Sequence, residues 1–350
     1  MKLLVITQAV DTENGALGFF VGWLRELATR FESIEVVCLY EGTHALPPNV
    51  RVHSLGKEDG GSRIQYAWRT YEYAWDLRDE YDAVFVHMNQ EYVLLAGWLW
   101  RLMGKRVYMW RNHYAGSWLT DVAAAFCTKV FCTSKHSYTA KYKKTVLMPV
   151  GIDLSRFERA NGAQEEAALH TFRSILFLAR IALSKRPEML IDALGTVLAR
   201  GVSFTADIVG SPADGDEGYA HSLETRAESL GLHDRVRFLD GVPHEQTPAL
   251  YAAHDIFVNC SPSGMFDKTL FEAAAAGCRV IAASDDFKDA AGEEAYAPDA
   301  DQLAERLCEA LGESSDSRLR RRTQMQALAR GESLGTLIDT LHAQITTETA

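Results

Sequence analysis

The feature that most constrains the fold is a repeated alternation of short apolar segments with longer amphipathic ones. Six apolar segments rich in β-branched residues precede residue 150, and five more follow residue 172. Segments with helical periodicity, such as 19–31, 63–78 and 91–103, separate the apolar segments. This alternation is typical of parallel sheets covered by helices. Because the chain contains two such series, we predict an α/β protein with two Rossmann-like domains.

The domain boundaries follow from the break between the two series. A polar, Ala-rich stretch at 158–171 is preceded by PVGIDLSRF, which we interpret as a hinge strand and turn. We assign 1–150 to an N-terminal Rossmann-like domain and 151–330 to a C-terminal Rossmann-like domain. The remaining segment, 331–350, has helical composition, and one arrangement to consider is its return to the N-terminal domain as a C-terminal helix.

Composition and charge exclude several classes of protein. The net charge of −11 argues against a nucleic-acid partner. Six scattered cysteines with no CxxC pair argue against a zinc site. The first apolar segment stops at Asp11, too early for a secretory signal, and the apolar stretch 92–104 is interrupted by Arg101 and is too short to span a bilayer. We therefore predict a cytoplasmic protein that holds no metal.

Two cations stand where the second series of strands begins. Ligands of open parallel sheets bind at the carboxyl ends of the strands. Arg180 closes the apolar segment RSILFLA, and Lys185 begins a helix that has Pro187 in its first turn. Cations beside a helix N-terminus fit a phosphate-binding site, whereas the alternative is that both are surface charges.

The densest signal lies in residues 259–281. A predicted strand ends in a Ser/Pro/Gly loop, and an Ala-rich helix closed by Gly277 follows. Free N–H groups and the dipole at the helix start can hold a diphosphate. Glu272 lies in that helix among apolar neighbours and needs a hydroxyl or cation as partner, which a ribose diol would supply. A capping interaction with Ser263 or Thr269 is the alternative.

The turn after the first strand contains two glycines. The sequence TENGALG lacks the GxGxxG spacing of a dinucleotide-binding loop, which argues against NAD. Gly15 and Gly18 would let the backbone come close to a ligand, but a tight turn without a ligand would use the same residues.

Taken together, these motifs resemble the retaining GT-B glycosyltransferases of family 4. The similarity covers nearly the whole chain and includes the glycine turn after the first strand, the GID…F segment at 151–157, the Arg180…Lys185 pair, Gly210 after a strand, and the block 272–281. The resemblance implies two Rossmann-like domains that face each other across a cleft, with 1–150 on the acceptor side and 151–330 binding the nucleotide sugar. It also implies transfer of a sugar from a nucleotide-sugar donor to a glycan, lipid-linked or small-molecule acceptor, with retention at the anomeric carbon.

The resemblance assigns roles to individual residues. Arg180 and Lys185 would neutralise the donor diphosphate, and Glu272 would bind the ribose. Such enzymes need neither metal nor another cofactor, because the cations and the helix dipole act in place of a metal. The donor-binding residues that the resemblance implies are Gly15, Gly18, His87, Gly210, Gly264, Met265, Phe266, Asp267, Lys268, Thr269 and Glu272.

One position departs from the common pattern of that family. The family often has two glutamates with seven residues between them, and here the first position is Gly264. The segment Gly264–Lys268 instead fits the Gly-x-x-Asp-Lys pattern of a subset of the family, so either Asp267 or Lys268 would contact the sugar hydroxyls or the phosphate. The pair Asp285-Asp286 is expected to be an N-cap rather than a metal-binding motif.

The family usually places a histidine after a central strand of the first domain, near the donor sugar and the acceptor. His113 follows KRVYMW and is our candidate for catalysis, and His87 ends DAVFVH and is a second candidate on the donor side. A hydrogen-bonded structural histidine is the alternative at both positions.

Two further alternatives stay open. The replaced first glutamate keeps a non-catalytic GT-B subunit, which binds a nucleotide or scaffolds a partner enzyme, as an alternative function. An aromatic and basic cluster in the first domain suggests peripheral contact with the inner face of a membrane, unless its helix is packed against the sheet. The cluster comprises Trp98, Trp100, Arg101, Lys105 and Arg106.

Overall fold

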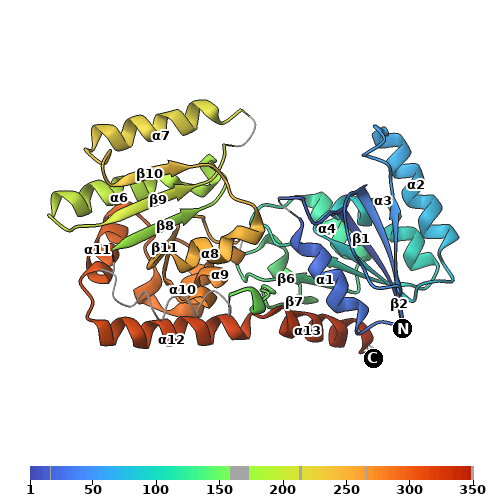
Figure 1. The fold of residues 1–350 in the computed structure, drawn as a ribbon. Helices are drawn as coiled ribbons and strands as arrows, with labels where there is room; N and C mark the ends of the chain where they lie inside the picture. Colours follow the sequence, from blue (N-terminus) through green and yellow to red (C-terminus); the bar gives the residue numbers. More distant parts are fainter. Residues whose placement is uncertain (16, 158–172, 213–214, 265–266, 348–350) are drawn as a thin grey trace. The chain divides into compact units, whose positions relative to one another are not determined.

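The computed structural model describes residues 1–15, 17–157, 173–212, 215–264 and 267–347. The chain divides into two compact units, each a parallel sheet between two layers of helices (Figure 1). Unit 1 comprises Met1–Pro149 and Leu334–Ala350, and unit 2 comprises Val150–Ser333. The α/β class with a Rossmann-like sheet in each unit, as expected from the two series of strands, is confirmed.

Unit 1 contains a seven-stranded sheet in the order β3-β2-β1-β4-β5-β6-β7, with every pair parallel. All six strands predicted for this half are present. The additional strand, β3, reads VRVHS and is mostly half-buried, so its apolar signal is weak. The bounds are β1 Lys2–Val10, β2 Ser33–Glu41, β3 Val50–Ser54, β4 Ala83–His87, β5 Arg106–Trp110, β6 Lys129–Cys132 and β7 Thr145–Leu147.

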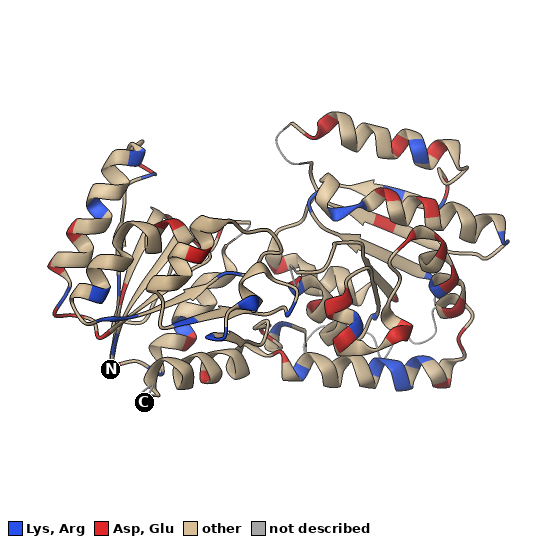
Figure 2. Ribbon diagram, turned by 180° about the vertical axis from the view of Figure 1, so that it is seen from behind, with Lys and Arg blue, Asp and Glu red and all other residues tan. Residues whose placement is uncertain are grey.

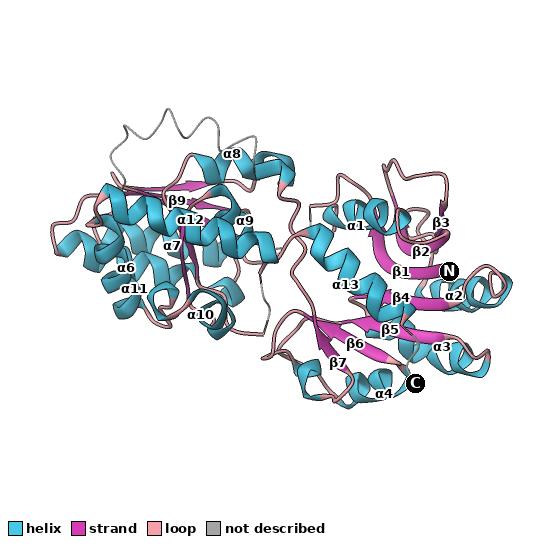
Figure 3. Ribbon diagram, turned by 90° about the horizontal axis from the view of Figure 1, so that it is seen from below, coloured by secondary structure: helices cyan, strands magenta, loops and turns pink. Residues whose placement is uncertain are grey.

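Helices cover both faces of this sheet, as Figure 3 shows. α1 (Phe19–Ala28) and α13 (Leu334–Thr346) pack on one face and against each other. α2 (Arg63–Asp76), α3 (Gln90–Leu102) and α4 (Trp118–Phe126) form the layer on the other face. A short 3-10 helix, Tyr138–Lys141, precedes β7.

The last helix belongs to unit 1 by its contacts. The buried side chains of α13, Leu337, Ile338, Leu341 and Ile345, follow helical spacing and join the core beneath α1. The hydroxyl of Tyr108 on β5 donates to the carbonyl of Ile345 at 3.1 Å. The C-terminal segment therefore completes a layer that the first 149 residues leave open on one face.

Unit 2 contains a five-stranded parallel sheet in the order β10-β9-β8-β11-β12. α6, α7 and α11 share the core of one face, and α8, α9, α10 and α12 that of the other. The strands are β8 Ser174–Leu178, β9 Thr205–Val209, β10 Val236–Leu239, β11 Ile256–Asn259 and β12 Arg279–Ala282. The helices are α6 Pro187–Ala199, α7 Glu217–Ser229, α8 Thr247–Ala252, α9 Lys268–Ala276, α10 Asp285–Ala291, α11 Ala300–Leu311 and α12 Ser315–Gly331, with short 3-10 helices at Leu183–Lys185, His244–Gln246 and Glu293–Ala295.

The two points where the chain enters and leaves unit 2 are tied together. The carbonyl of Glu332 accepts the N–H groups of Gly151 (3.0 Å) and Ile152 (2.9 Å), and its carboxylate accepts the N–H of Val150 at 2.7 Å. Burial raises the pKa of this carboxyl. Because Ser333 also pairs with Ile152 in a β-bridge, unit 2 extends to Ser333 rather than to residue 330.

Each sheet has one point where the strand order reverses. In unit 1 it lies between β1 and β4, and in unit 2 between β8 and β11. Loops after two neighbouring strands diverge at such a point, which leaves a crevice where open α/β sheets bind ligands. The residues that follow β8 and β11 are therefore the first place to look for a site in unit 2.

Candidate active site

Two distant motifs meet at the reversal point of unit 2. Lys185, in the 3-10 helix after β8, places its Nζ 2.6 Å from Oδ2 of Asp267 and 3.2 Å from Oγ of Ser261. Asp267 and Ser261 both belong to the segment between β11 and α9. The structure thus brings Lys185, which follows the first strand of unit 2, into contact with the loop before the Ala-rich helix.

Arg180 lies at the same edge of the sheet, two residues after β8 ends. Its side chain is exposed, and within the described ranges no hydrogen bond or ion pair of Arg180 is found. Its neighbour Arg186 is different, because it caps α6 with a left-handed backbone (φ 52°) and donates to the carbonyl of Pro298 at 3.2 Å. Arg186 stabilises the loop, whereas the guanidinium of Arg180 is accessible to an anion from solution.

Asp267 orients Lys185. It occupies the N-cap position of α9, and its Oδ2 also accepts a hydrogen bond from Nδ2 of Asn259 at 3.3 Å. Burial alone would raise the pKa of Asp267, but Lys185 and Asn259 outweigh burial and hold it below its usual value. The carboxylate is therefore ionised at neutral pH and fixes the ammonium of Lys185 in one position.

Lys268 begins α9 and is half-buried. Its Nζ donates to the carbonyl of Gly151 at 3.2 Å. Burial lowers the pKa of Lys268 to about 7, although Glu272 acts in the opposite direction. Near neutral pH this amine can change its charge when an anion binds beside it.

Glu272 lies one turn further along α9 and is buried. Its Oε2 accepts a hydrogen bond from the hydroxyl of Tyr251 at 3.1 Å, and its Oε1 lies 3.2 Å from Nε2 of His244. The capping alternative is wrong, because α9 has no side-chain cap and the hydroxyl of Ser263 pairs with Asp285 instead. The carboxylate is held in place by a phenol and an imidazole, neither of which the sequence pointed to.

The loop before α9 is tied to the start of α10. Gly264 has φ +90° and donates its N–H to Oδ2 of Asp286 at 2.7 Å, so this amide is engaged within the protein. The expectation that Asp285-Asp286 is an N-cap needs correction. Ser284 caps α10, and the two aspartates lie in its first turn and reach back to the loop. Met265 and Phe266, two predicted donor-binding residues, lie outside the described residues.

Gly210 follows β9 and permits a close approach of two strand ends. A Cβ at this position would lie 1.8 Å from the carbonyl oxygen of Ala179, the residue before Arg180. The N–H of Gly210 donates to the carbonyl of Leu239 at 2.9 Å. The glycine is therefore required by packing, and its contact with a donor stays a prediction.

The reversal point of unit 1 carries the two glycines after β1. Gly18 donates its N–H to the carbonyl of Asn14 at 2.8 Å, and a Cβ on Gly18 would lie 2.8 Å from that oxygen. A Cβ on Gly15 would meet nothing within 4 Å. Gly18 thus serves the tight turn, whereas nothing in the packing around Gly15 requires a glycine.

The two candidate histidines lie in different environments. His87 is 1% exposed, its ring stacks on Phe20 with centroids 4.0 Å apart, and its Nδ1 lies 3.3 Å from Oγ1 of Thr7. This environment favours the structural alternative for His87. The next residue, Met88, has φ +70°, a strained conformation for a residue with a side chain, at the end of β4.

His113 is less enclosed. The N–H of Ala115 donates to Nδ1 of His113 at 2.9 Å, and the ring stacks on Tyr114 with centroids 4.6 Å apart. Nδ1 also lies 3.3 Å from the carbonyl oxygen of Ala115, so these contacts suit either tautomer of the ring. The role of His113 in catalysis stays a prediction.

The aromatic and basic cluster expected in unit 1 is not a single surface. Trp100 is fully buried, and Nζ of Lys105 donates to the carbonyls of Arg78 (2.7 Å) and Tyr81 (2.5 Å). Trp98 and Arg101 are exposed. Among the helices that the structure describes, none is long and apolar enough to cross a bilayer.

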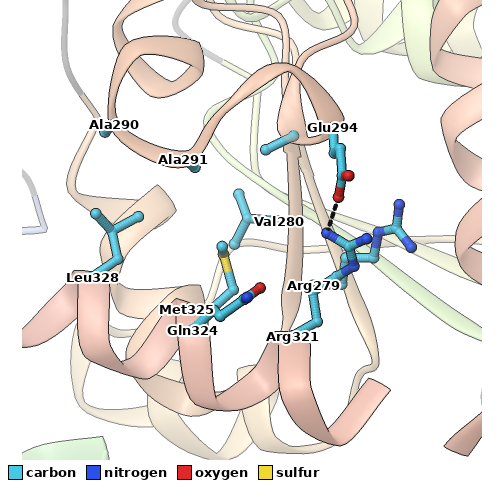
Figure 4. A pocket seen from close by; sticks show the side chains of 10 residues that line it. Arg279, Val280, Ala290, Ala291, Glu294, Arg321, Gln324, Met325 and Leu328 are labelled. Atoms are coloured by element: carbon cyan, nitrogen blue, oxygen red, sulfur yellow. Dashed lines mark ion pairs between the residues drawn. The ribbon is translucent and has the colours of Figure 1, made fainter. Parts of the chain in front are cut away.

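A hollow of about 250 Å³ lies elsewhere in unit 2, between α10, β12 and α12 (Figure 4). Its arginines come from the start of β12 and from α12, a helix rich in arginine, as Figure 2 shows in blue. Arg321 pairs with Glu294 at 2.5 Å, and Arg279 pairs with Glu313 at 2.5 Å. Because carboxylates neutralise both arginines, this hollow is a weaker candidate for a diphosphate than the site at Arg180.

No group of three or more His, Cys, Asp or Glu side chains that could hold a metal ion occurs in the described part of the chain. The polar groups at the reversal point of unit 2 are cations, amides and the carboxylates of Asp267 and Glu272, and both carboxylates have protein partners. The chemistry that this arrangement supports is the binding of an anion.

Comparison with known proteins agrees with this geometry. Residues 173–313 match the family described as Glycosyl transferases group 1. A D-inositol 3-phosphate glycosyltransferase of Geodermatophilus obscurus is 31% identical over 159 residues, which are 42% of this chain and 34% of the relative. An alpha-monoglucosyldiacylglycerol synthase of Streptococcus pneumoniae is 26% identical over 253 residues, 62% of this chain and 56% of the relative. The aligned regions thus span from a third to about half of these relatives.

Solved structures resemble the chain over its whole length. Anabaena Alr3699/HepE, solved in complex with UDP and glucose, has a TM-score of 0.77 at 19% identity, with 99% of this chain and 100% of that chain covered. Sucrose-phosphate synthase from Thermosynechococcus elongatus has a TM-score of 0.71 at 18% identity, with 99% of each chain covered. The likeness to both is one of fold. Residues 173–313 thus match the group 1 glycosyltransferases, and the fold of the chain is the GT-B fold, as the resemblance in its sequence predicted.

Proposed function

We propose that this chain is a retaining glycosyltransferase that moves a sugar from a nucleoside-diphosphate sugar to a glycan, lipid-linked or small-molecule acceptor. The observation that carries the proposal is the contact of Lys185 with Ser261 and with Asp267 at the start of α9, at the sheet edge where Arg180 also lies. The same unit contains the residues that match the group 1 glycosyltransferases.

The charges at this point suit a departing diphosphate. When the bond between the anomeric carbon and the diphosphate oxygen breaks, negative charge grows on the leaving group. Arg180, Lys185 and the N–H groups of α9 stabilise that charge more strongly than they stabilise the intact donor, which lowers the barrier. No metal takes part in this proposal, because the cations and the helix dipole supply the positive charge.

Glu272 is proposed to bind the ribose of the donor. Its two oxygens each accept one hydrogen bond in the protein and retain lone pairs for two adjacent hydroxyls. His113 is proposed to donate from Nε2 to the donor sugar. Asp267 acts through Lys185, which it orients, and Lys268 is proposed to contact the phosphate.

A uridine nucleotide is the first donor to test. Anabaena Alr3699/HepE was solved with UDP and with UDP-glucose, although its identity to this chain is only 19% and 18% in those structures. A lipid-linked acceptor is one of the classes to test because one relative is named for a diacylglycerol product. With that acceptor the enzyme would work in the cytoplasm at the inner face of the membrane.

Release of nucleoside diphosphate from a panel of nucleotide sugars, with EDTA present, tests the proposal. We expect turnover with one donor, and we expect Arg180→Ala to lower it about a hundredfold, the typical effect of removing one charge-stabilising group. Arg200→Ala is the matched control, because Arg200 is an exposed arginine at the opposite end of α6. Turnover of Arg180→Ala within a few-fold of the unchanged protein would refute the assignment.

The alternative function, a non-catalytic subunit, predicts a different result. Such a subunit would bind a nucleoside diphosphate but would release none from any donor, with or without acceptors. The relatives named above are enzymes, which favours the catalytic proposal.

A further inference from the structure

Large apolar side chains are exposed in one region of unit 1. Of the fifteen exposed large hydrophobic side chains among the described residues, eight lie on α2, α3 and α4, the three helices of one layer. Five of these eight lie on α2 and α3, which pack side by side (Figure 1). We call these five the α2–α3 surface: Ile64 (82% exposed), Trp68 (67%), Trp75 (52%), Trp98 (48%) and Leu102 (78%).

The α2 part of the surface is a continuous stripe. Ile64, Trp68, Tyr71 and Trp75 follow one another at intervals of four, three and four residues. At about 100° per residue, these positions fall within an arc of roughly 60° on one side of the helix. The half-buried Tyr71 joins the stripe to α3, because its hydroxyl donates to the carbonyl of Leu95 at 2.7 Å and its ring lies 6.4 Å from that of Trp98.

The area of this surface is large for a monomer. Taking roughly 250 Å² for a whole tryptophan, the three tryptophans alone expose about 400 Å². A standard interface buries about 800 Å² per partner, and the largest apolar patch of a typical monomer is about 300–600 Å². With Ile64 and Leu102 added, the α2–α3 surface approaches the area that a stable dimer needs on each subunit.

The charges on α2 lie beside the stripe rather than on it. Arg69 donates to the carbonyl of Leu55 at 2.9 Å, and Arg63 and Asp76 lie on opposite sides of the stripe. In an antiparallel pair of α2 helices the two apolar stripes cover each other, and the helix dipoles are also antiparallel. The apolar stripe is therefore complementary to its own copy.

The same charges disfavour a membrane as the partner. The indole N–H of Trp68 donates to the carboxylate of Glu72 at 2.7 Å, so a carboxylate lies directly beside the apolar stripe. Insertion of the stripe into lipid would bury that charge, whereas a protein interface can pair it. The four charges on α2, Glu72 included, sum to zero, which gives no net attraction to an anionic surface.

We propose that the α2–α3 surface binds the same surface of a second copy of this chain, with the two α2 helices antiparallel, and makes the protein a symmetric dimer. The proposal does not rest on the transfer reaction, because it uses neither Arg180 nor any other residue of the candidate active site.

Sedimentation velocity of the full chain at 1–100 µM tests the proposal. We expect a species of twice the 38.9 kDa chain mass for the unchanged protein and a monomer for the double variant Trp68→Glu/Trp75→Glu. Both side chains are more than half exposed in the single chain, so the variant is expected to fold. Leu319→Glu, which changes an exposed leucine (65%) on α12 of unit 2, is the matched control and is expected to stay dimeric.

A monomer at 100 µM, or a dimer unaffected by Trp68→Glu/Trp75→Glu, would overturn the proposal. Flotation of a monomeric chain with phosphatidylglycerol vesicles, lost in the tryptophan variant, would also overturn it in favour of a membrane.

Discussion

The pair formed by Lys185 and Asp267 leads to a prediction that separates the two cations of the candidate site. Lys185→Met removes a charge that donor binding is proposed to use, and it also leaves the carboxylate of Asp267 without its cation. Arg180→Met removes a charge for donor binding but leaves no carboxylate unpaired, because Arg180 is exposed and forms no ion pair with any of the described residues. The two substitutions should therefore have similar effects on the donor and different effects on the free energy of unfolding.

The magnitude follows from the geometry of the pair. The two charged atoms are 2.6 Å apart, and the side chains are 16% and 20% exposed. At an effective dielectric constant of about 20, the gross attraction is about 6 kcal/mol, most of which desolvation offsets. We expect Lys185→Met to lower the free energy of unfolding by about 2 kcal/mol and Arg180→Met to change it by less than about 0.5 kcal/mol.

Urea unfolding of a double-mutant cycle measures this effect. Lys185→Met/Asp267→Asn should be more stable than Lys185→Met alone, with a coupling of about 1–3 kcal/mol, because the unpaired carboxylate is gone. Calorimetric titration with UDP should show affinity lowered about tenfold or more by Arg180→Met, and to a similar extent by Lys185→Met. Additive effects of the Lys185 and Asp267 substitutions, or equal destabilisation by Arg180→Met, would refute the reasoning.

Three further predictions concern neighbouring residues. Gly210→Ala should destabilise unit 2 by several kcal/mol in urea unfolding, because the new Cβ would lie 1.8 Å from the carbonyl oxygen of Ala179; stability within 0.5 kcal/mol of the unchanged protein would contradict the packing. UDP binding at pH 8 should take up as much as one proton, because burial lowers the pKa of Lys268 to about 7 and a bound diphosphate favours the protonated amine. Titrations in two buffers of different ionisation enthalpy measure the uptake, which Lys268→Met should abolish. Glu272→Gln should weaken UDP about tenfold or more and leave the affinity for inorganic pyrophosphate unchanged, because only the nucleotide carries a ribose.

Every strand of the two sheets except β3 could be predicted, because buried parallel strands are nearly continuous apolar segments. KLLVITQAV and RSILFLAR contain enough β-branched and apolar residues to stand out from their surroundings. β3 could not be found in this way, because VRVHS is mostly half-buried and carries an arginine and a histidine. The return of 331–350 to the N-terminal domain was one arrangement that the sequence suggested, and the shared core of α13 and α1 shows that the chain adopts it.

The positions of Arg180 and Lys185 were predictable because strand ends and helix starts mark the ligand edge of a parallel sheet. The hydrogen-bond partners of other residues near the site could not be predicted, because these partners come from distant parts of the chain. Tyr251 and His244 hold Glu272 through contacts that no local pattern signals, and Asp286 reaches back 22 residues to the N–H of Gly264. For His87 the sequence could not separate two roles. A histidine at a strand end could reach a ligand, but it could equally occupy the buried position, stacked on an aromatic ring, that the structure shows.

The central claim is that the donor diphosphate binds at the reversal point between β8 and β11. A crystal structure of the protein with UDP, grown with EDTA, tests this claim most directly. The account predicts phosphate oxygens within hydrogen-bonding distance of Arg180, Lys185 and the first N–H groups of α9, with the ribose at Glu272. A diphosphate bound elsewhere, such as between Arg279 and Arg321 in the hollow of Figure 4, would contradict it.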